Sequence, residues 1–434
     1  MKPFMFIMAP VETRSGYGDH SRDLITSLIE MDMFDIKVKS VKWGNTPMTG
    51  LDKSREDHME IEKRLYWEQG LNVQPDVMIH IGVPNEFQNW GKFNVGITAG
   101  IETTQCSSEW LQGLNKMDMI IVPSEHSKNV FEKTIFERMD ENTGQKVGEL
   151  KCEVPIHVLY EGVNTDIFKP TKEKDQEVEE MMSKVKGDCF LMVGHWLKGE
   201  MGQDRKDISG LIKVFCETFK NQSRKPSLVL KTSGADFSHI DRREIRSKIQ
   251  QVKGTISPQE GLPDVYFIHG DLSEKQMNHL YNHSKVKAHI SFTKGEGYGR
   301  PLAEASCSGK LVIAPKWSGH VDFLDPKFSV LLTGQLTPVH DSAVWENVIE
   351  KGSSWFTVDY NVAATMIRNY YNNQKAYKSR GHKQSKHIRE NFSLESMKKD
   401  FKELVKSQFP KTAKQIDIKL PDLPSMELPT LRSS

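Results

Sequence analysis

The residues best suited to chemistry lie in one stretch, Lys294 to Asp322, which begins KGEGYGRPLAEA. Glu296 lies among three glycines, directly after an apolar run over 286–292 that is typical of a buried strand. Pro301 is typical of a first helical turn, and Glu304 then falls one turn into that helix. A strand, a glycine loop and a helix start expose backbone N–H groups and favour a phosphate. We expect Glu296 to meet a sugar, Glu304 to meet a ribose diol, and a phosphate to lie between them.

The full string EGYGRPLAE, followed by GKLVIA from Gly309 and GHVD from Gly319, resembles the donor-site motif of retaining GT-B glycosyltransferases of the family-four type. The alternative is the glycine loop of an ordinary α/β protein with both glutamates solvated, and a glycine cluster alone does not separate the two. The resemblance implies an α/β fold with two Rossmann-like, doubly wound parallel-sheet domains facing across a cleft. It also implies that Glu296 is catalytic and that a nucleotide-sugar donor, linked to UDP or GDP, is bound by Tyr298, Gly299, Arg300, Pro301, Leu302 and Glu304.

Size and composition agree with a two-domain globular protein. The chain has 434 residues, a formal net charge of +1, 27% charged and 37% hydrophobic residues. That length predicts two domains, and the charge balance does not itself indicate nucleic acid or membrane. No apolar run has the length of a membrane span, and the start MKPFMFIMAP is too short for a signal peptide. Five scattered cysteines without a C-x-x-C pair indicate a reducing compartment, so we expect a cytoplasmic location.

Strand and helix patterns alternate along the first part of the chain. Strand-like runs occupy 4–8, 36–41, 77–81, 95–98 and 119–122, and helical patterns occupy 19–30, 107–116 and 126–138. This alternation predicts a doubly wound parallel sheet whose ligands bind beyond the carboxyl ends of the strands.

Two loops of this first part follow strand ends. The loop VETRSGYG contains Gly16 and Gly18, but it is not the G-x-G-x-x-G fingerprint, so a plain turn and a ligand loop both remain open. The resemblance implies that it faces the donor. Glu102 follows the run at 95–98, and we expect it to point into the crevice as a second catalytic residue; a helix-capping or solvated glutamate is the alternative. Many family members have a histidine in this region, and this sequence has none.

The segment HVLYEGVNTDIFKP, residues 157–170, resembles the part of the family in which the last strand of the first domain runs into the hinge. We therefore expect an acceptor-side domain over 1–171 and a nucleotide-sugar domain over 172–410, whose terminal helices cross back to the first domain. Helical patterns at 363–371 and 393–409 supply those helices. Residues 411–434 contain three prolines and read as a flexible tail.

The second domain begins with the run Phe190–Gly194, and the segment after it contains candidate diphosphate ligands. It resembles the family's glycine-Arg…Arg-Lys-Gly motif, with Lys206 at the motif lysine, Arg205 before it, and His195 where the motif has an arginine. A solvated cationic face is the alternative, but a diphosphate leaving group needs fixed positive charge. Lys231 and Thr232 end the next strand, and we expect them on the donor side too.

A basic tract from Arg368 to Lys419 contains 14 Lys or Arg and 5 Asp or Glu residues. Solvated helix faces are one explanation, and a surface that contacts a phosphate backbone, with Lys398, Lys399 and Lys402 as contacts, is the other.

No Asp-x-Asp occurs in the sequence, so the metal-holding carboxylate pair of the other large glycosyltransferase fold is absent. We expect a metal-independent enzyme without a cofactor, in which cations stabilise the departing diphosphate. The strings MAPVETRSGYG and TAGIETT resemble glycosyltransferases of T-even-like bacteriophages, which implies 5-hydroxymethylcytosine in double-stranded phage DNA as acceptor. A cell-surface glycan or lipid-linked sugar is the competing acceptor. A non-catalytic nucleotide-sugar-binding protein is the alternative of another class. The sequence leaves the oligomeric state open.

Overall fold

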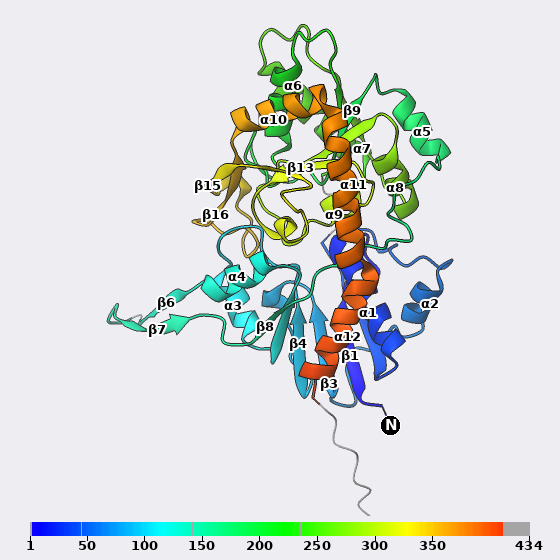
Figure 1. Cartoon of the computed structure of the whole chain (residues 1–434). Coiled ribbons are helices and arrows are strands. Elements are labelled where there is room, and N and C mark those ends of the chain that lie inside the picture. Colours follow the sequence, from blue (N-terminus) through cyan, green and yellow to red (C-terminus); the bar gives the residue numbers. More distant parts are fainter. Residues whose placement is uncertain (1, 45, 141, 235–236, 411–434) are drawn as a thin grey trace, which may run out of the picture.

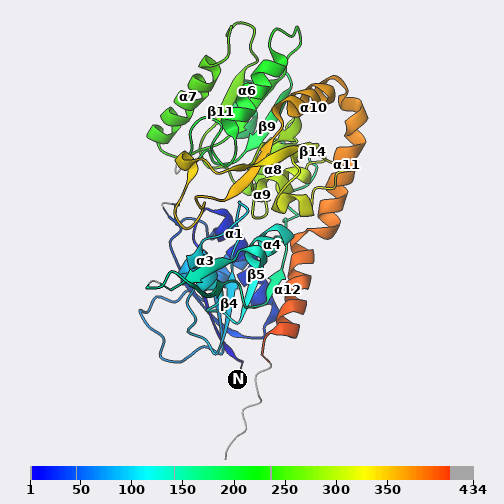
Figure 2. The ribbon, with the colours of Figure 1, turned by 90° about the vertical axis from the view of Figure 1, so that its left-hand side faces the viewer.

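The computed structural model describes residues 2–44, 46–140, 142–234 and 237–410, and it contains two parallel sheets of six strands each. Figures 1 and 2 show the two sheets as the centres of two domains stacked one above the other, with the first domain below. The expected tail over 411–434 lies outside the described residues, and the expected boundary near 172 stays a prediction.

The first sheet has the strand order β2-β1-β3-β4-β5-β8. Its strands are β1 (Phe4–Ala9), β2 (Asp35–Ser40), β3 (Val77–Ile81), β4 (Phe93–Ile97), β5 (Met119–Val122) and β8 (Ile156–Val158). The helices of this part are α1 (Gly16–Met31), α2 (Glu56–Glu62), α3 (Ser108–Leu114), α4 (Glu125–Lys133) and the short η1 (Pro84–Glu86). Ser15, Ser107 and Ser124 cap α1, α3 and α4 by accepting a hydrogen bond from a first-turn N–H, which explains why these helices start where they do.

The second sheet has the order β11-β10-β9-β12-β13-β14. Its strands are β9 (Cys189–Val193), β10 (Ser227–Lys231), β11 (Val265–Ile268), β12 (Val286–Ile290), β13 (Leu311–Pro315) and β14 (Val330–Leu332). Its helices include α5 (Gln176–Ser183), α6 (Ile208–Phe219), α7 (His239–Gly254), α8 (Glu274–Asn282), α9 (Arg300–Ser306) and η2 (Gly319–Asp322).

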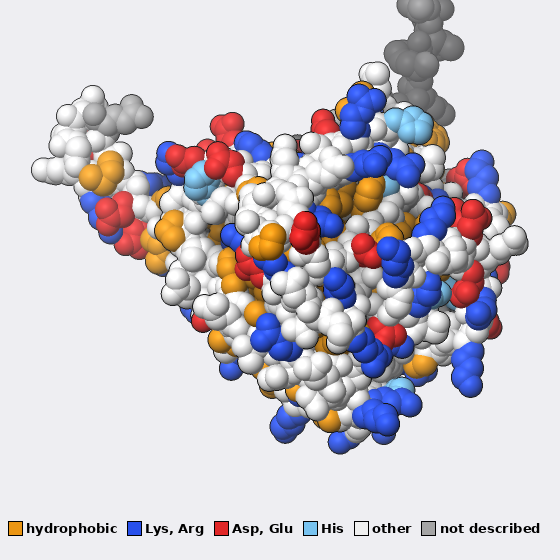
Figure 3. Space-filling model, turned by 90° about the horizontal axis from the view of Figure 1, so that it is seen from above, with side chains coloured by type: hydrophobic (Ala, Val, Ile, Leu, Met, Phe, Trp, Pro, Cys, Tyr) orange, Lys and Arg blue, Asp and Glu red, His pale blue; other side chains and the backbone are white. Residues whose placement is uncertain are grey.

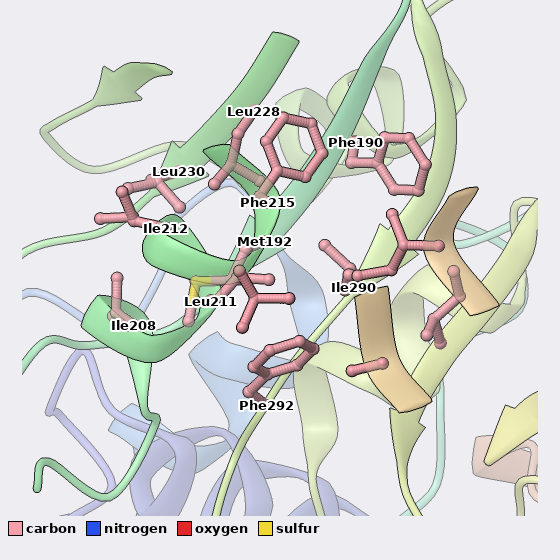
Figure 4. Close-up of a cluster of buried hydrophobic side chains, with 14 of the residues drawn as sticks. Phe190, Met192, Ile208, Leu211, Ile212, Phe215, Leu228, Leu230, Ile290 and Phe292 are labelled. Carbon is pink, nitrogen blue, oxygen red and sulfur yellow. The ribbon is translucent and has the colours of Figure 1, made fainter. Parts of the chain in front are cut away.

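The apolar residues of the second sheet alternate between two cores. Phe190 and Met192 of β9 face α6 and α7, whereas Cys189 and Leu191 of the same strand face α5 and α8. Figure 4 shows the first of these cores, in which side chains of α6 interdigitate with those of β9, β10 and β12. Because successive strand residues point to opposite faces, the continuous apolar runs of the sequence become a sheet covered on both sides.

Two antiparallel hairpins lie outside the sheets. The strands β6 (Phe136–Met139) and β7 (Lys146–Leu150) form an arm that projects to the left in Figure 1. The strands β15 (Gly334–Pro338) and β16 (Ser354–Val358) pair beside the second sheet, with η3 (Asp341–Ala343) between them. At the loop end of this hairpin, Thr104 N donates to Ser354 O (2.8 Å) and Ser354 N donates to Thr104 Oγ1 (2.9 Å), which ties the hairpin to the first domain.

Three consecutive helices end the described chain. They are α10 (Tyr360–Asn372), α11 (Gln374–Asn391) and α12 (Leu394–Gln408). In both Figure 1 and Figure 2, α11 runs along the upper domain and α12 continues along the lower one. The side chains of Met397, Phe401 and Val405 on α12 belong to the core of the first sheet. The described chain therefore begins and ends in the same domain.

One expectation about helices was wrong, and one helix was missed. The helix expected over 126–138 ends at Lys133, because β-branched Thr134 and Ile135 lead into β6. The 18-residue helix α11 was not predicted at all. All five cysteines are unpaired thiols, and within the described ranges no helix is long and apolar enough to cross a membrane.

The strand order gives each sheet a point at which successive connections leave in opposite directions. This point lies between β1 and β3 in the first sheet and between β9 and β12 in the second. Ligands of open parallel sheets bind at such points, beyond the carboxyl ends of the strands. The loops after β1, β9 and β12 therefore define where a site is expected.

The packing of α12 predicts the effect of truncating Phe401, whose side chain is fully buried. Phe401→Ala should lower the free energy of unfolding by about 3–5 kcal/mol, since it removes a large apolar group and leaves a cavity. Urea denaturation measures the loss. Lys402→Ala, at the exposed next position, is the control and should change stability by less than about 0.5 kcal/mol. Equal stability of the two variants would contradict this packing.

Candidate active site between the two domains

The loop that joins β12 to α9 carries Glu296 and packs directly on the first domain. A Cβ atom on Gly295 would lie 1.9 Å from Glu102 O, and one on Gly297 would lie 1.9 Å from Ala99 O. Only glycine allows backbone to approach backbone this closely. Gly299 has φ +100°, a left-handed conformation that also favours glycine. The glycines therefore bring Glu296 and the Glu102 loop together.

Two cations and two carboxylates meet at this contact. Lys206 Nζ donates to Glu296 Oε1, and Arg205 Nη1 lies 3.1 Å from Glu296 Oε2. The same guanidinium nitrogen donates to Gly295 O (3.1 Å) and lies 3.6 Å from Glu102 Oε1. Glu102 comes from the first domain and the other three come from the second, so the cluster spans the cleft. It unites four residues that sequence analysis predicted for the site.

The charges within this cluster are balanced, and burial shifts their pKa values. Burial alone would raise the pKa of Glu296, but the charges of Lys206 and Arg205 hold it at about 2. Burial raises the pKa of Glu102 and is opposed by Arg205, and burial lowers the pKa of Lys206. Glu296 is therefore a firmly ionised group paired with fixed cations, whereas Glu102 holds a proton more readily than an exposed glutamate.

The cations are positioned by groups that sequence analysis missed. Lys294 N donates to Arg205 O (2.7 Å), which joins the Glu296 loop to the segment before α6. The buried Lys294 Nζ lies 3.9 Å from Asp207 Oδ2, and Tyr360 OH donates to that carboxylate at 2.6 Å. Asp207 also caps α6 by accepting from Gly210 N. Lys294, the first residue of the motif, is the only sign in the sequence of these groups that position the cations.

A second charged cluster surrounds Arg300 at the start of α9. Both terminal nitrogens of Arg300 donate to Asp23 Oδ2 at 3.1 Å, which connects α9 to α1 of the first domain. Arg300 Nη1 lies 3.7 Å from Glu161 Oε2, and Arg300 Nε lies 3.4 Å from Glu304 Oε1. Tyr281 OH donates to Glu304 Oε2 at 3.1 Å. The expected ribose-binding Glu304 is thus oriented by Arg300 and Tyr281.

Three carboxyl groups share this one guanidinium, and their pKa values are raised. Burial, opposed by Arg300, raises the pKa of Glu304 to about 8, that of Glu161 to about 7 and that of Asp23 to about 6. Sequence analysis did not identify Asp23, Glu161 or Tyr281. The segment that contains Glu161 was noted only as a hinge.

The remaining donor-side residues lie at the carboxyl ends of β9 and β10. His195 Nδ1 lies 3.0 Å from Ser233 Oγ, and burial together with the nearby Lys206 and Lys231 lowers its pKa to about 4, so the ring is neutral. Lys231 Nζ donates to Gly270 O at 2.7 Å. Thr232 Oγ1 is buried and has no hydrogen-bond partner among the described residues.

In the glycine loop of the first domain, one glycine is tightly packed against backbone and the other has free space beside it. A Cβ atom on Gly18 would lie 2.2 Å from Thr13 O, whereas one on Gly16 would meet nothing within 4 Å. Gly18 is therefore required by packing. Gly16 has space that a ligand can approach, and its expected role in donor binding stays a prediction.

Two residues of the motif, Tyr298 and Leu302, are buried in the core of the second domain. The Tyr298 ring packs on Phe323 at 4.9 Å between centroids, and both Tyr298 and Leu302 belong to the core beside α9. Pro301 occupies the first turn of α9 as expected. The expected part of Tyr298 and Leu302 in donor binding stays a prediction.

A polar cavity of about 530 Å³ lies between the domains beside the Arg300 cluster. It is lined by Asp23 and Arg300 and, farther out, by Arg55 and Glu274, whose charged groups pair at 3.0 Å across the domain boundary. Over the described residues, no group of three or more His, Cys, Asp or Glu side chains is arranged to hold a metal ion.

Comparison with known proteins now defines the class of fold. Residues 201–353 match the family model described as "Glycosyl transferases group 1". This segment contains Arg205, Lys206, Glu296, Arg300 and Glu304. No curated protein matches the chain.

Among solved structures, HepE from Anabaena in complex with UDP and glucose superimposes with a TM-score of 0.61 at 11% identity, over 93% of this chain and 100% of that one. A glycosyltransferase from Rickettsia africae gives 0.61 at 15% identity, over 93% and 98% of the chains. Sucrose-phosphate synthase from Thermosynechococcus elongatus gives 0.61 at 13% identity, over 94% and 98%. The chain therefore has the GT-B fold, as expected, with two Rossmann-like parallel-sheet domains.

The raised pKa of Glu304 predicts a pH dependence of stability. From about pH 4.5 to about pH 8 the folded protein keeps a proton that the unfolded chain releases, so stability falls as pH rises, by up to about 1.4 kcal/mol per pH unit. Glu304→Gln cannot titrate and should lose less stability between pH 5 and 8, measured by urea denaturation. Glu217→Gln, at an exposed glutamate of α6, should follow the wild-type profile. A Glu304→Gln profile parallel to the wild type would argue against the raised pKa.

Proposed function

We propose that the protein is a retaining glycosyltransferase that moves a sugar from a nucleotide sugar to a hydroxyl group. Of the two donor types, UDP-sugars and GDP-sugars, we favour a UDP-sugar. The observation that carries the proposal is the four-residue cluster of Glu102, Arg205, Lys206 and Glu296 at the contact of the two GT-B domains. Three of these residues lie within the segment that matches the group 1 model. The neighbouring structure of HepE contains UDP and glucose, which supports a UDP-sugar donor.

The chemistry follows from the charges. When the bond between sugar and diphosphate breaks, negative charge grows on the departing phosphate. Arg205 and Lys206 are fixed cations, one partly and one fully buried, so they can stabilise that charge without reorganisation. Glu296 and Glu102 neutralise these cations, which keeps the cost of burying them low. Glu296 is ionised and suited to accept hydrogen bonds from sugar hydroxyls. We propose that Glu304 meets the ribose.

Arg205 and Lys206 supply the positive charge that a divalent cation would otherwise supply, so we propose metal-independent transfer. Activity should then persist in EDTA, and strict dependence on added Mg²⁺ or Mn²⁺ would contradict this part of the proposal. A non-catalytic sugar-nucleotide-binding protein would bind UDP-sugars without releasing UDP. Measuring UDP release therefore distinguishes this alternative from a glycosyltransferase.

Lys206→Ala tests the proposed role of the cation pair. It should lower kcat by about a hundredfold and change the donor KM much less, because the charge on the leaving group is greatest in the transition state. UDP release from UDP-sugars, measured with a coupled assay, gives both constants. Lys213→Ala, at an exposed lysine of α6, is the control and should be silent. A Lys206→Ala variant with unchanged kcat would remove Lys206 from the reaction.

For the acceptor we propose 5-hydroxymethylcytosine in DNA, supported by the basic outer face of α11. At 100° per residue, Lys375, Lys378, Lys386 and Arg389 fall within an arc of about 80°, and all four are exposed. Figure 3 shows, by contrast, that cationic and acidic side chains intermingle on the upper face of the molecule.

The expectation that Lys398 contacts phosphates needs correction. Lys398 Nζ pairs with Glu30 at 2.7 Å, and its side chain is only 18% exposed. It lines the interdomain cavity and joins α12 to α1. The exposed cations of α11 replace it in the proposed DNA contact.

Charge reversal on α11 tests the DNA acceptor. The triple variant Lys378→Glu, Lys386→Glu, Arg389→Glu should abolish binding of a duplex that contains 5-hydroxymethylcytosine and leave UDP release in the absence of acceptor unchanged. Wild-type binding should weaken with salt by about 0.9 log units per phosphate contact per log unit of salt. Filter binding or fluorescence anisotropy measures both effects.

The control is Lys116→Glu, Lys133→Glu, Lys151→Glu, which makes the same charge change at exposed lysines of the first domain. If both triple variants bind DNA like the wild type and salt has little effect, the DNA acceptor is wrong. Transfer to a glycan or lipid-linked sugar that survives the α11 reversal would then identify the competing acceptor.

A further inference from the structure

Two aromatic rings lie over the carboxyl edge of the first sheet and take no part in the charged site. Tyr17, in the first turn of α1, stacks on Trp43, which follows β2, with ring centroids 4.0 Å apart and planes inclined by 28°. Tyr17 OH is held by Thr98 Oγ1 (3.0 Å) and accepts from Ala99 N (3.0 Å), beyond the end of β4. The pair therefore reaches from the β2 end to the β4 end, over β1 and β3 between them. We call Tyr17 and Trp43 the aromatic platform.

The aromatic platform adjoins the Glu296 cluster. Ala99, whose N–H donates to Tyr17, presents its carbonyl oxygen to Gly297, and Glu102 lies three residues farther along the same loop. The platform also lies at the point between β1 and β3 where ligands of such sheets bind. It belongs to the half of the cleft that faces the donor-side residues.

The surroundings of the platform suit an aromatic, phosphate-bearing ligand. Both rings are only partly buried, so surface remains for a further ring. Within the described part of the chain, the indole N–H of Trp43 makes no hydrogen bond, and the exposed Lys42 next to it has no ion-pair partner. A flat aromatic face with an adjacent free cation is the combination that binds nucleotides of single strands or of flipped bases, through stacking and a phosphate contact.

We propose that the aromatic platform is the acceptor-base subsite, where an unstacked pyrimidine lies on Trp43 and Lys42 contacts its phosphate. This inference rests on the proposed transfer to DNA and adds the residues that select the acceptor. A base held there lies on the first-domain side of the cleft, next to Glu102 and opposite the donor-side cations. The subsite selects a planar ring, whereas the cations of α11 bind the backbone without regard to sequence.

The test uses the full-length protein and a short single-stranded oligonucleotide that contains one 5-hydroxymethylcytosine. Trp43→Leu keeps apolar bulk but removes the flat face, and Trp43→Phe keeps a flat ring. Titrations in the presence of UDP, followed by anisotropy of the labelled oligonucleotide, should show roughly five- to hundredfold weaker binding for Trp43→Leu. Trp43→Phe should stay within about threefold of the wild type. Trp67→Leu, at a tryptophan that is 75% exposed, is the matched control and should be silent.

Further measurements distinguish a role of Trp43 in oligonucleotide binding from misfolding of the variants and from failure of the proposed function. The affinity for UDP, measured by calorimetry, should be equal in all variants, and the acceptor KM should rise in Trp43→Leu with little change in kcat. Quenching of tryptophan emission by the oligonucleotide should be reduced in Trp43→Phe. Lack of UDP release from every nucleotide sugar would refute the proposed function, yet the oligonucleotide titrations would still report on the platform.

The proposal is overturned if Trp43→Leu binds the oligonucleotide as the wild type does, or loses no more affinity than Trp67→Leu. It is equally overturned if the wild type does not bind the oligonucleotide with UDP present. Quenching of Trp43 by methyl glucosides or maltose in place of the oligonucleotide would assign the platform to a sugar ring and exclude the base.

Discussion

The contact between the two domains depends on a buried balance of charge. Arg205 and Lys206 from one loop meet Glu296 from the same domain and Glu102 from the other. An unpaired charge in this position would be costly to bury, so removing any one partner leaves another without compensation. The glycines at 295 and 297 are the steric condition for this balance, because any side chain there would collide with the 99–102 backbone.

The same constraint explains why the cleft has two different halves. The second sheet presents cations and carboxylates at the ends of β9 and β12, and the first sheet presents the aromatic platform and Glu102. Arg300 adds a second link across the cleft through Asp23, and the pairs Arg14–Asp271 (3.7 Å) and Arg55–Glu274 (3.0 Å) add two more. The proposed site, which holds an anionic leaving group on one side and a neutral ring on the other, matches this division.

The alternation of strands and helices could be predicted from the sequence because the strands of a buried parallel sheet form continuous apolar runs. Every strand of both sheets lies at or within a few residues of such a run. Helix α11 could not be predicted because it lacks such an apolar pattern. Its buried residues are Gly381, Gln384, Ser385 and Ile388, and only the last of these is a large apolar residue, so no apolar stripe marks the helix. Gly381 lets the helix approach Gly309 O so closely that a Cβ atom would lie 2.5 Å away, and Gln384 Nε2 donates to Phe323 O at 2.7 Å. Packing by polar contacts and by close approach of a glycine gives the sequence no helical period of apolar residues.

By itself, the sequence determined the strands of the two sheets and their alternation with helices, the glycine loop with its two glutamates, and the cations at 205 and 206, because each is a local pattern of residue types. Only the tertiary structure decided which charges meet. Arg205 and Glu102, like Arg300 and Asp23, are far apart in the chain, and they pair because two strand-end loops face each other across the cleft. The pKa of Glu304 and the stacking of Tyr17 on Trp43 are of the same kind, since burial and ring contact arise from packing between elements that no local pattern relates.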